Sequence, residues 1–83
     1  MAHRKVPSIL ITVSGIRGIG KTTLLCHIVK SLSDIGIANI TADSRTQNEL
    51  KDKSLQELRM ESFIKQVKTG KTLIVVREEI HGQ

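Results

Sequence analysis

The feature that most constrains the fold of this chain is the segment "GIRGIGKT" at residues 15–22. It matches the pattern G-x-x-x-x-G-K-[ST], in which a glycine-rich turn leads from a strand into a helix. Glycines let the backbone turn sharply, so that several N–H groups gather around one anion, and the positive end of the following helix faces the same point. The pattern therefore predicts a turn that binds phosphate.

The apolar pattern around this turn predicts three strands and two helices. Residues 9–13 and 72–76 are uninterrupted apolar runs, which are typical of buried parallel strands, and the alternation in residues 37–43 indicates a half-exposed edge strand. Helical spacing predicts helices over residues 21–35 and 54–68. The order β-α-β-α-β implies an α/β fold, a minimal three-layer arrangement with a three-stranded parallel sheet and right-handed crossovers.

Capping residues predict where the helices begin and end. Gly36 and Gly70 stand where a left-handed residue ends a helix. Ser54 opens a capping box for the second helix. Residues 44–53 are polar without a sustained apolar period, so we expect either a mobile loop or a short helical turn capped at Thr46. Arg45, Lys51 and Lys53 in this segment either close over phosphates or are solvated.

The two predicted helices differ in which residues should be buried. On the first, an apolar stripe is expected to face the sheet, while Thr23 and His27 fall on the wet face and Cys26 is a small buried filler. On the second, Phe63 is expected in the core. The apolar stripe of the first helix consists of Leu25, Ile28, Val29, Leu32 and Ile35, and the other expected core residues of the second helix are Met60, Ile64 and Val67.

Length and composition limit the number of domains, the class of partner and the location of the protein. The 83 residues suffice for one small domain, which we place over residues 1–83. The net charge of +5 suits an anionic partner, but the chain has no Tyr or Trp to stack on bases and no nucleic-acid module, so the expected partner is a nucleotide and not a nucleic acid. A single cysteine fits a reducing cytoplasm, and no segment reaches transmembrane length.

Residues 9–32 resemble the Walker A segment of P-loop NTPases. The segment "GIRGIGKTTLL" is similar to the loop of signal-transduction ATPases such as plant immune receptors, and to that of ABC-type ATPases. Ile16 replaces the signature lysine of MinD-like ATPases, which disfavours that group. In length and layout the chain also resembles short stand-alone P-loop proteins of phage genomes. The resemblance implies binding of ATP or GTP with Mg²⁺.

Carried onto this chain, the resemblance gives roles to individual residues of the turn. Lys21 is expected to contact the β- and γ-phosphates, Thr22 to ligate Mg²⁺, and Thr23 to contact the α-phosphate. Arg17 is a candidate contact to a phosphate or to the base side. The complete predicted nucleotide-binding set is Gly15, Ile16, Arg17, Gly18, Ile19, Gly20, Lys21, Thr22 and Thr23.

The acidic partner that usually accompanies such a turn is missing from its expected place. Arg77 follows the strand predicted at residues 72–76, where a Walker B aspartate would stand. Glu78 is either a metal-shell carboxylate or general base, or part of a solvated strand end. Asp43 is either a Mg²⁺ or second-substrate ligand, or a turn or helix N-cap residue. The predicted catalytic residues are thus Lys21, Glu78 and Asp43, and the predicted metal ligands are Thr22 and Asp43.

These observations favour a protein that binds a nucleoside triphosphate with Mg²⁺ and hydrolyses it slowly at most. The alternatives are a small NTPase or kinase with efficient phosphoryl transfer, a non-catalytic module that senses or sequesters a nucleotide signal, and a basic adaptor for polyanions. In the kinase-like strand order, residues 9–13 form an exposed apolar edge, so we also expect a homodimer or larger homo-oligomer that covers it.

Overall fold

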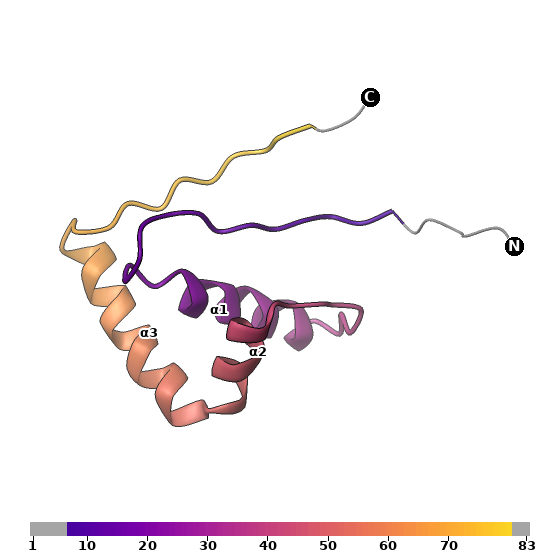
Figure 1. Cartoon of the computed structure of the whole chain (residues 1–83), viewed down its shortest axis with the longest axis horizontal. Helices are drawn as coiled ribbons and strands as arrows, with labels where there is room; N and C mark the ends of the chain where they lie inside the picture. The colour runs from indigo at the N-terminus through magenta and orange to yellow at the C-terminus, as the bar shows by residue number, and fades with distance from the viewer. Residues whose placement is uncertain (1–6, 81–83) are drawn as a thin grey trace, which may run out of the picture.

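The fold is described by a computed structural model covering residues 7–80, which contain three helices. They are α1 (Lys21–Asp34), α2 (Ser44–Lys51) and α3 (Lys53–Lys68), and each contacts the other two. Residues 7–80 contain no β-strand, so the expected α/β fold with a three-stranded parallel sheet is wrong. The described part of the chain is a group of three helices from which two extended arms lead away (Figure 1).

The two arms are the apolar segments that the sequence predicts as buried strands. The N-terminal arm (residues 7–14) runs toward the phosphate turn (residues 15–22), whereas the C-terminal arm (residues 72–80) leaves from the same end of the molecule (Figure 1). The arms therefore head in opposite directions, which a parallel ladder does not allow. Ile9 is 92% exposed and Val76 is 90% exposed, so neither predicted strand is buried.

The third predicted strand, at residues 37–43, is also absent. The amide of Ile40 donates to the carbonyl of Ala38 at 2.9 Å, which is a tight turn and not extended pairing. The alternation of apolar and polar residues in this segment is therefore not used to cover a sheet face. The segment instead connects the end of α1 to the start of α2.

Helix α1 (Lys21–Asp34) differs by one residue from the predicted span of 21–35, and Gly36 ends it as predicted. Gly36 has φ of +94°, its amide donates to the carbonyl of Ser33 at 3.0 Å, and the Ile37 amide donates to the carbonyl of Leu32 at 3.1 Å. This is a Schellman motif, in which the left-handed glycine lets the last carbonyls find partners. Gly70, with φ of +78°, follows the end of α3 in the same way.

The start of α3 differs from the prediction, whereas α2 begins after Asp43, for which an N-cap was one of the two alternatives, and not at a cap on Thr46. The carboxylate of Asp43 accepts from the Thr46 amide at 3.3 Å, and that of Asp52 accepts from the Leu55 amide at 3.1 Å. Aspartates are therefore the N-caps, and Thr46 and Ser54 are not. Each aspartate lies upstream of the residue that was predicted as the cap, and Asp caps a helix as well as Ser or Thr does. The polar segment after Asp43 is thus a two-turn helix.

The small core lies on a different side of α1 from the one that its apolar stripe predicts. Cys26 and Phe63 are the buried hydrophobic residues of the described part of the chain, and Thr23 is buried although it was expected in solvent. Helix α2 packs on this side of α1, and no sheet covers the apolar stripe. The radius of gyration of 15.1 Å exceeds the about 12 Å of a compact domain of this length.

Within residues 7–80, no helix has both the length and the apolar character needed to cross a membrane.

Candidate phosphate-binding site

A cavity of about 290 Å³ opens where the phosphate turn meets all three helices. The turn and the first residues of α1 form its floor, and side chains from α2 and α3 form its wall. Its lining comprises Arg17, Gly18, Gly20, Lys21, Thr22 and Thr23 from the turn and α1, Arg45 and Glu49 from α2, and Arg59, Ser62, Phe63 and Gln66 from α3. The structure thus brings residues that are far apart in sequence to the predicted phosphate site.

Two glycines give the turn its shape. Gly18 and Gly20 have φ of +87° and +94°, which is the left-handed region that side-chain-bearing residues rarely adopt. At Gly20 there is a second constraint, because a Cβ atom would lie 2.5 Å from Cδ1 of Phe63. Glycine at this position therefore allows both the turn and the close packing of α3 against it.

The ammonium group of Lys21 is held inside the turn. Its Nζ atom donates to the backbone carbonyl of Gly15 at 2.8 Å and also to that of Ile16. The lysine predicted to contact phosphates is thus folded over the cradle that the turn forms. The hydroxyl of Thr22, the predicted Mg²⁺ ligand, makes no hydrogen bond with another residue of the described part of the chain.

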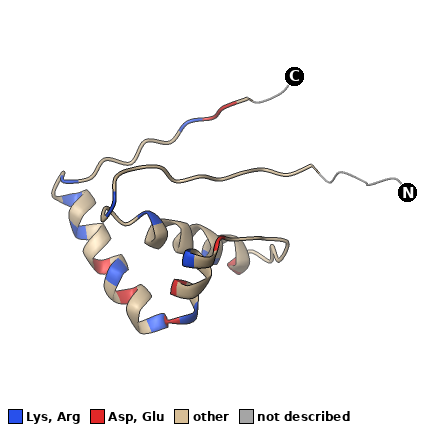
Figure 2. Cartoon of the chain, viewed as in Figure 1, with Lys and Arg blue, Asp and Glu red and all other residues tan. Residues whose placement is uncertain are grey.

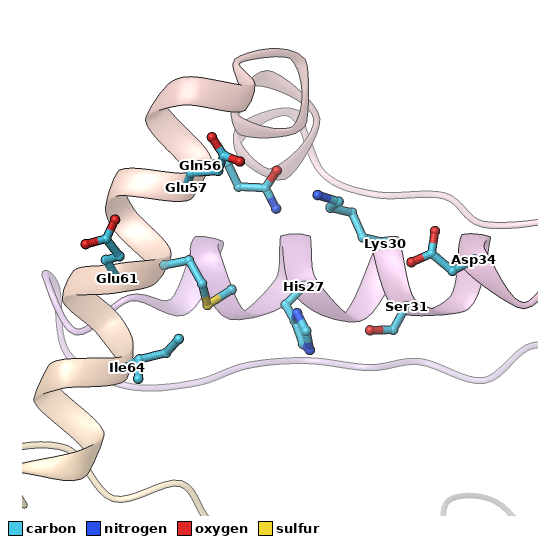
Figure 3. A pocket seen from close by; sticks show the side chains of 9 residues that line it. His27, Lys30, Ser31, Asp34, Gln56, Glu57, Glu61 and Ile64 are labelled. Atoms are coloured by element: carbon cyan, nitrogen blue, oxygen red, sulfur yellow. The ribbon is translucent and has the colours of Figure 1, made fainter.

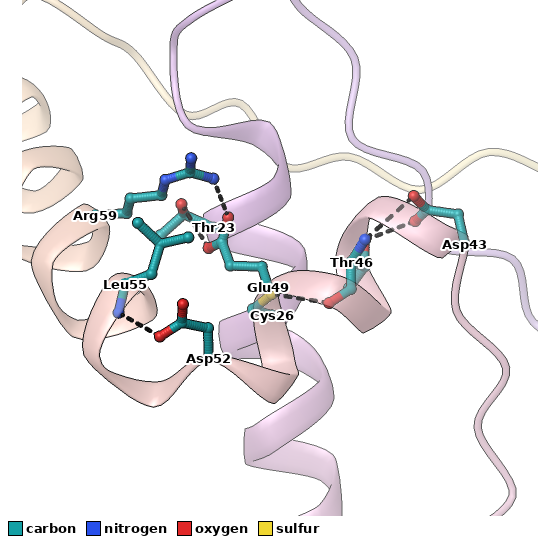
Figure 4. Close-up of polar contacts among 8 residues, drawn as sticks. All are labelled: Thr23, Cys26, Asp43, Thr46, Glu49, Asp52, Leu55 and Arg59. Atoms are coloured by element: carbon teal, nitrogen blue, oxygen red, sulfur yellow. Dashed lines mark hydrogen bonds and ion pairs between the residues drawn. The ribbon is translucent and has the colours of Figure 1, made fainter.

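A buried carboxylate joins the three helices behind the turn. Glu49 of α2 accepts from the Thr23 hydroxyl of α1 at 2.9 Å and from Nη1 of Arg59 of α3 at 2.8 Å (Figure 4). The side chain of Glu49 is 2% exposed, so removal from water would be costly if either oxygen lacked a partner. Both oxygens are satisfied, and the Thr23 hydroxyl is committed to this contact.

The charged side chains that line the cavity are predominantly basic. Four cationic side chains, those of Arg17, Lys21, Arg45 and Arg59, surround a single carboxylate, that of Glu49. Basic residues occur on the turn and on each helix that borders it (Figure 2). A concave surface with an excess of one charge raises the local concentration of ions of the opposite charge. The arrangement therefore suits an anion.

The two predicted carboxylates lie elsewhere. Asp43 caps α2, where its two oxygens accept from the amide and from the hydroxyl of Thr46, the latter at 2.6 Å. The hydrogen bond from the Thr46 hydroxyl is the main reason that the pKa of Asp43 is below its ordinary value. Glu78 lies in the exposed C-terminal arm, beside the Arg77–Glu79 ion pair. Neither lines the cavity, and of the two alternatives for Asp43 the structure shows the N-cap.

Glu49 and Arg59 are charged residues of the lining that the sequence did not identify as part of the site, and Ser62, Phe63 and Gln66 were not identified either. Glu49 lies in the segment for which the sequence predicted a loop or a short turn capped at Thr46, and no local pattern marked Arg59. Their side chains meet because α2 and α3 form a tight hairpin, with a single residue, Asp52, between the two helices. Arg45 was one of the residues considered for closing over phosphates, and it does line the cavity.

Cys26 lies next to this buried network. Its thiol is fully buried and contacts the carbonyl of Thr46 at 3.5 Å. Burial, followed by the nearby negative charge of Glu49, raises the pKa of the thiol from 9.0 to about 11. The thiolate is the reactive form of cysteine, so this residue is a structural filler and not a nucleophile at neutral pH.

A second and larger hollow, of about 620 Å³, lies between α1 and α3 away from the turn (Figure 3). Its side chains are of both charges and include His27, Lys30, Asp34, Glu57 and Glu61. No group of three His, Cys, Asp or Glu residues in the described ranges is arranged to hold a metal ion. This hollow therefore lacks the excess of positive charge that distinguishes the cavity at the turn.

A family model described as an AAA domain matches residues 8–81. The matched segment includes the phosphate turn, the three helices and most of both arms. Comparisons with curated proteins and with solved structures give no match.

Proposed function

Because the chain belongs to the AAA domain family, a family of P-loop nucleotide-binding modules, we propose that it binds ATP or GTP with Mg²⁺ at the phosphate turn. The observation that carries this proposal is the basic cavity over the turn, in which Lys21 and three arginines surround the backbone of Gly18 and Gly20. The proposed activity is binding with at most slow hydrolysis.

The size of the cavity supports a site for phosphates and not for a whole nucleotide. Its volume of about 290 Å³ is at the lower end of the range for small-molecule sites, which is roughly 300–1,000 Å³. Charged groups line it, and its single aromatic side chain, that of Phe63, is packed against Gly20. The phosphates would therefore occupy the cavity while the base extends outside it, and ATP and GTP would bind with similar affinities.

Binding requires Lys21 to leave the carbonyls of the turn. The ammonium group of Lys21 is engaged with the neutral carbonyls of Gly15 and Ile16 and has to leave them to reach a phosphate oxygen. Hydrogen bonds between an ammonium group and a charged phosphate oxygen are stronger than those to a neutral carbonyl. A nucleotide would thus replace the self-contacts of Lys21 with stronger ones.

The Thr22 hydroxyl fits a role as ligand to a phosphate-bound Mg²⁺, since it lines the cavity and has no partner in residues 7–80. Mg²⁺ is usually held by one or two protein oxygens together with phosphate oxygens, whose negative charge it neutralises. The carboxylates of Asp43 and Glu78 lie outside the cavity lining. Within the described part of the chain, the turn is thus better equipped to bind phosphates than to activate water.

Efficient phosphoryl transfer is the less favoured alternative for the same reason. The one carboxylate in the lining, Glu49, already accepts from Thr23 and Arg59 and is removed from solvent. A general base needs an oxygen within reach of the attacking group. A module that senses or sequesters a nucleotide therefore remains the closer alternative to slow hydrolysis.

The test is calorimetric titration of the chain with ATP and with GTP in the presence of Mg²⁺, followed by assay of phosphate release. We expect both nucleotides to bind, and Lys21→Ala to weaken binding at least about tenfold, because a charge-assisted hydrogen bond is lost. Lys68→Ala, on α3 and outside the cavity lining, is the control. Absence of binding by the unaltered chain would refute the proposal, and fast lysine-dependent phosphate release would favour the enzyme.

A further inference from the structure

We propose that Arg59, positioned by Glu49, is a direct phosphate contact that makes the site selective for ligands carrying two or more phosphate groups. The inference rests on the proposed function, because it assigns a role within the same cavity. It is carried by the contact between Arg59 and Glu49 and by the presence of Arg59 in the lining of the cavity, together with Lys21 and the glycines of the turn.

The two partners of the Arg59–Glu49 pair differ sharply in their exposure to solvent. The side chain of Glu49 is 2% exposed, whereas that of Arg59 is 53% exposed. A guanidinium group carries five N–H donors, and the contact of Arg59 with Glu49 is made by Nη1. Among residues 7–80, Glu49 is the sole hydrogen-bonding partner of the Arg59 side chain. The other N–H donors of the Arg59 guanidinium group are thus available to a ligand, while the buried carboxylate of Glu49 holds the guanidinium group through Nη1.

The anchor is connected to the turn itself. Glu49 also accepts from the hydroxyl of Thr23, which follows directly after Lys21 and Thr22 in the first turn of α1. The Thr23–Glu49–Arg59 connection therefore holds the guanidinium group of α3 at a set position relative to the phosphate turn (Figure 4). An arginine that is already ordered loses less conformational entropy when it binds a ligand. Glu49 is accordingly a positioning residue.

The location of Arg59 suggests which ligands benefit. A single phosphate would be satisfied by the N–H groups of the turn and by Lys21. A longer phosphate chain carries more charge and extends from the turn to the wall that Arg59 and Arg45 provide. Arginine matches the geometry of phosphate oxygens with two parallel hydrogen bonds. The contribution of Arg59 should therefore grow with the number of phosphates.

The experiment compares the affinities for ATP, AMP and inorganic tripolyphosphate by calorimetry in the presence of Mg²⁺. Arg59→Gln removes the charge but leaves Glu49 buried without its cation. A second variant therefore combines Glu49→Gln with Arg59→Gln, which retains an acceptor for Thr23 and leaves the net charge of the chain unchanged. Arg77→Gln is the matched control, because Arg77 also pairs with a glutamate, at 3.1 Å, but lies outside the cavity. Circular dichroism establishes that each variant is folded.

We expect both Arg59 variants to bind ATP and tripolyphosphate about tenfold more weakly, AMP less than about twofold more weakly, and Arg77→Gln to bind like the unaltered chain. The inference is overturned if the folded double variant binds tripolyphosphate as tightly as the unaltered chain, or if AMP loses as much affinity as ATP. If Lys21→Ala still weakens binding in that case, the proposed function survives. If the unaltered chain binds none of the three, the proposed function fails first.

Discussion

The ring of Phe63 lies so close to the backbone of Gly20 that a methyl group at Gly20 would come within 2.5 Å of the ring. Phe63 belongs to α3 and Gly20 to the phosphate turn, and Phe63 is one of two hydrophobic residues buried in the described part of the chain. The turn is therefore not a free loop. Its shape and the packing of α3 depend on one another, and this dependence underlies the first prediction.

Gly20→Ala should destabilise the fold more than Gly18→Ala does. Both glycines have a left-handed φ, which costs about 1–2 kcal/mol for alanine, but at Gly18 nothing lies within 4 Å of an added Cβ. At Gly20 the collision with Phe63 adds about 1–3 kcal/mol. Urea denaturation measures the difference between the two variants. Equal free energies of unfolding would show that the contact between Phe63 and Gly20 has no energetic consequence.

Thr23→Val should lower the free energy of unfolding by about 1–3 kcal/mol, because it leaves one oxygen of the buried Glu49 carboxylate without a donor. Thr22→Val is the matched control, since the Thr22 hydroxyl has no partner among residues 7–80, and it should change stability little. Thermal or urea denaturation in the absence of nucleotide separates the two. If Thr23→Val were as stable as the unaltered chain, the Glu49 oxygen that loses the Thr23 hydroxyl would have to accept from water or from Arg59 instead.

Asp43 should make stability depend on acid. Its hydrogen bond from the Thr46 hydroxyl holds its pKa below the ordinary value of 3.8. A group with a lowered pKa stabilises the folded chain above its unfolded pKa, and this contribution is lost as the pH falls through the folded pKa. Asp43→Asn retains a capping oxygen without the titration. The free energy of unfolding, measured from neutral pH into acid, should therefore fall less steeply for Asp43→Asn than for the unaltered chain. Identical pH profiles for the two chains would contradict the assignment.

Cys26 should react slowly with thiol reagents. Its pKa is raised to about 11, chiefly by burial. The contribution of the protonated thiol to the stability of the folded chain is therefore fully present below pH 9.0 and is lost as the pH rises toward 11. Modification by a disulfide reagent near neutral pH should be much slower than that of a denatured sample. Glu49→Gln should lower this pKa, since the charge of Glu49 raises it. Equal reaction rates in the folded and denatured chain would refute the assignment.

The arms should lead to self-association of this chain. Ile9, Leu73 and Val76 are each more than four-fifths exposed, and extended apolar segments with unpaired backbone groups tend to pair with other strands. Light scattering should show a dimer or larger species. Val76→Lys should shift it toward the monomer, whereas Leu58→Lys, which charges an exposed position on α3, should not. A monomer at all concentrations would refute the expectation.

Local features were predictable where a short segment determines its own conformation. The glycine-rich turn, the span of α1 and the glycines after α1 and α3 were all correctly placed, because capping and helical periodicity act within a few residues. The helix at Ser44–Lys51 was predicted only as a possible turn. There the sequence contains two candidate N-caps, Asp43 and Thr46. Asp43 is the N-cap in the structure, where its two oxygens accept hydrogen bonds from the amide and the hydroxyl of Thr46.

The sheet was mispredicted because a strand is completed by its neighbours. Apolar runs at residues 9–13 and 72–76 suit buried strands, but a strand forms only where another strand pairs with it. In residues 7–80 the two arms run in opposite directions, which excludes a parallel ladder, and they are not joined by an antiparallel ladder either. Thr23 was placed in solvent for a related reason. Helical periodicity distinguishes two faces of α1 but does not say which one α2 will cover.

By itself the sequence determined the phosphate turn and the helix that follows it, since both arise from backbone conformations that glycine and local hydrogen bonds select. Only the tertiary structure decided what surrounds the turn. Glu49 and Arg59 reach it through the α2–α3 hairpin, while Asp43 and Glu78 remain outside its cavity. Contacts between residues distant in sequence depend on how the helices pack and on the direction in which they run. A local sequence pattern predicts neither the packing nor the direction.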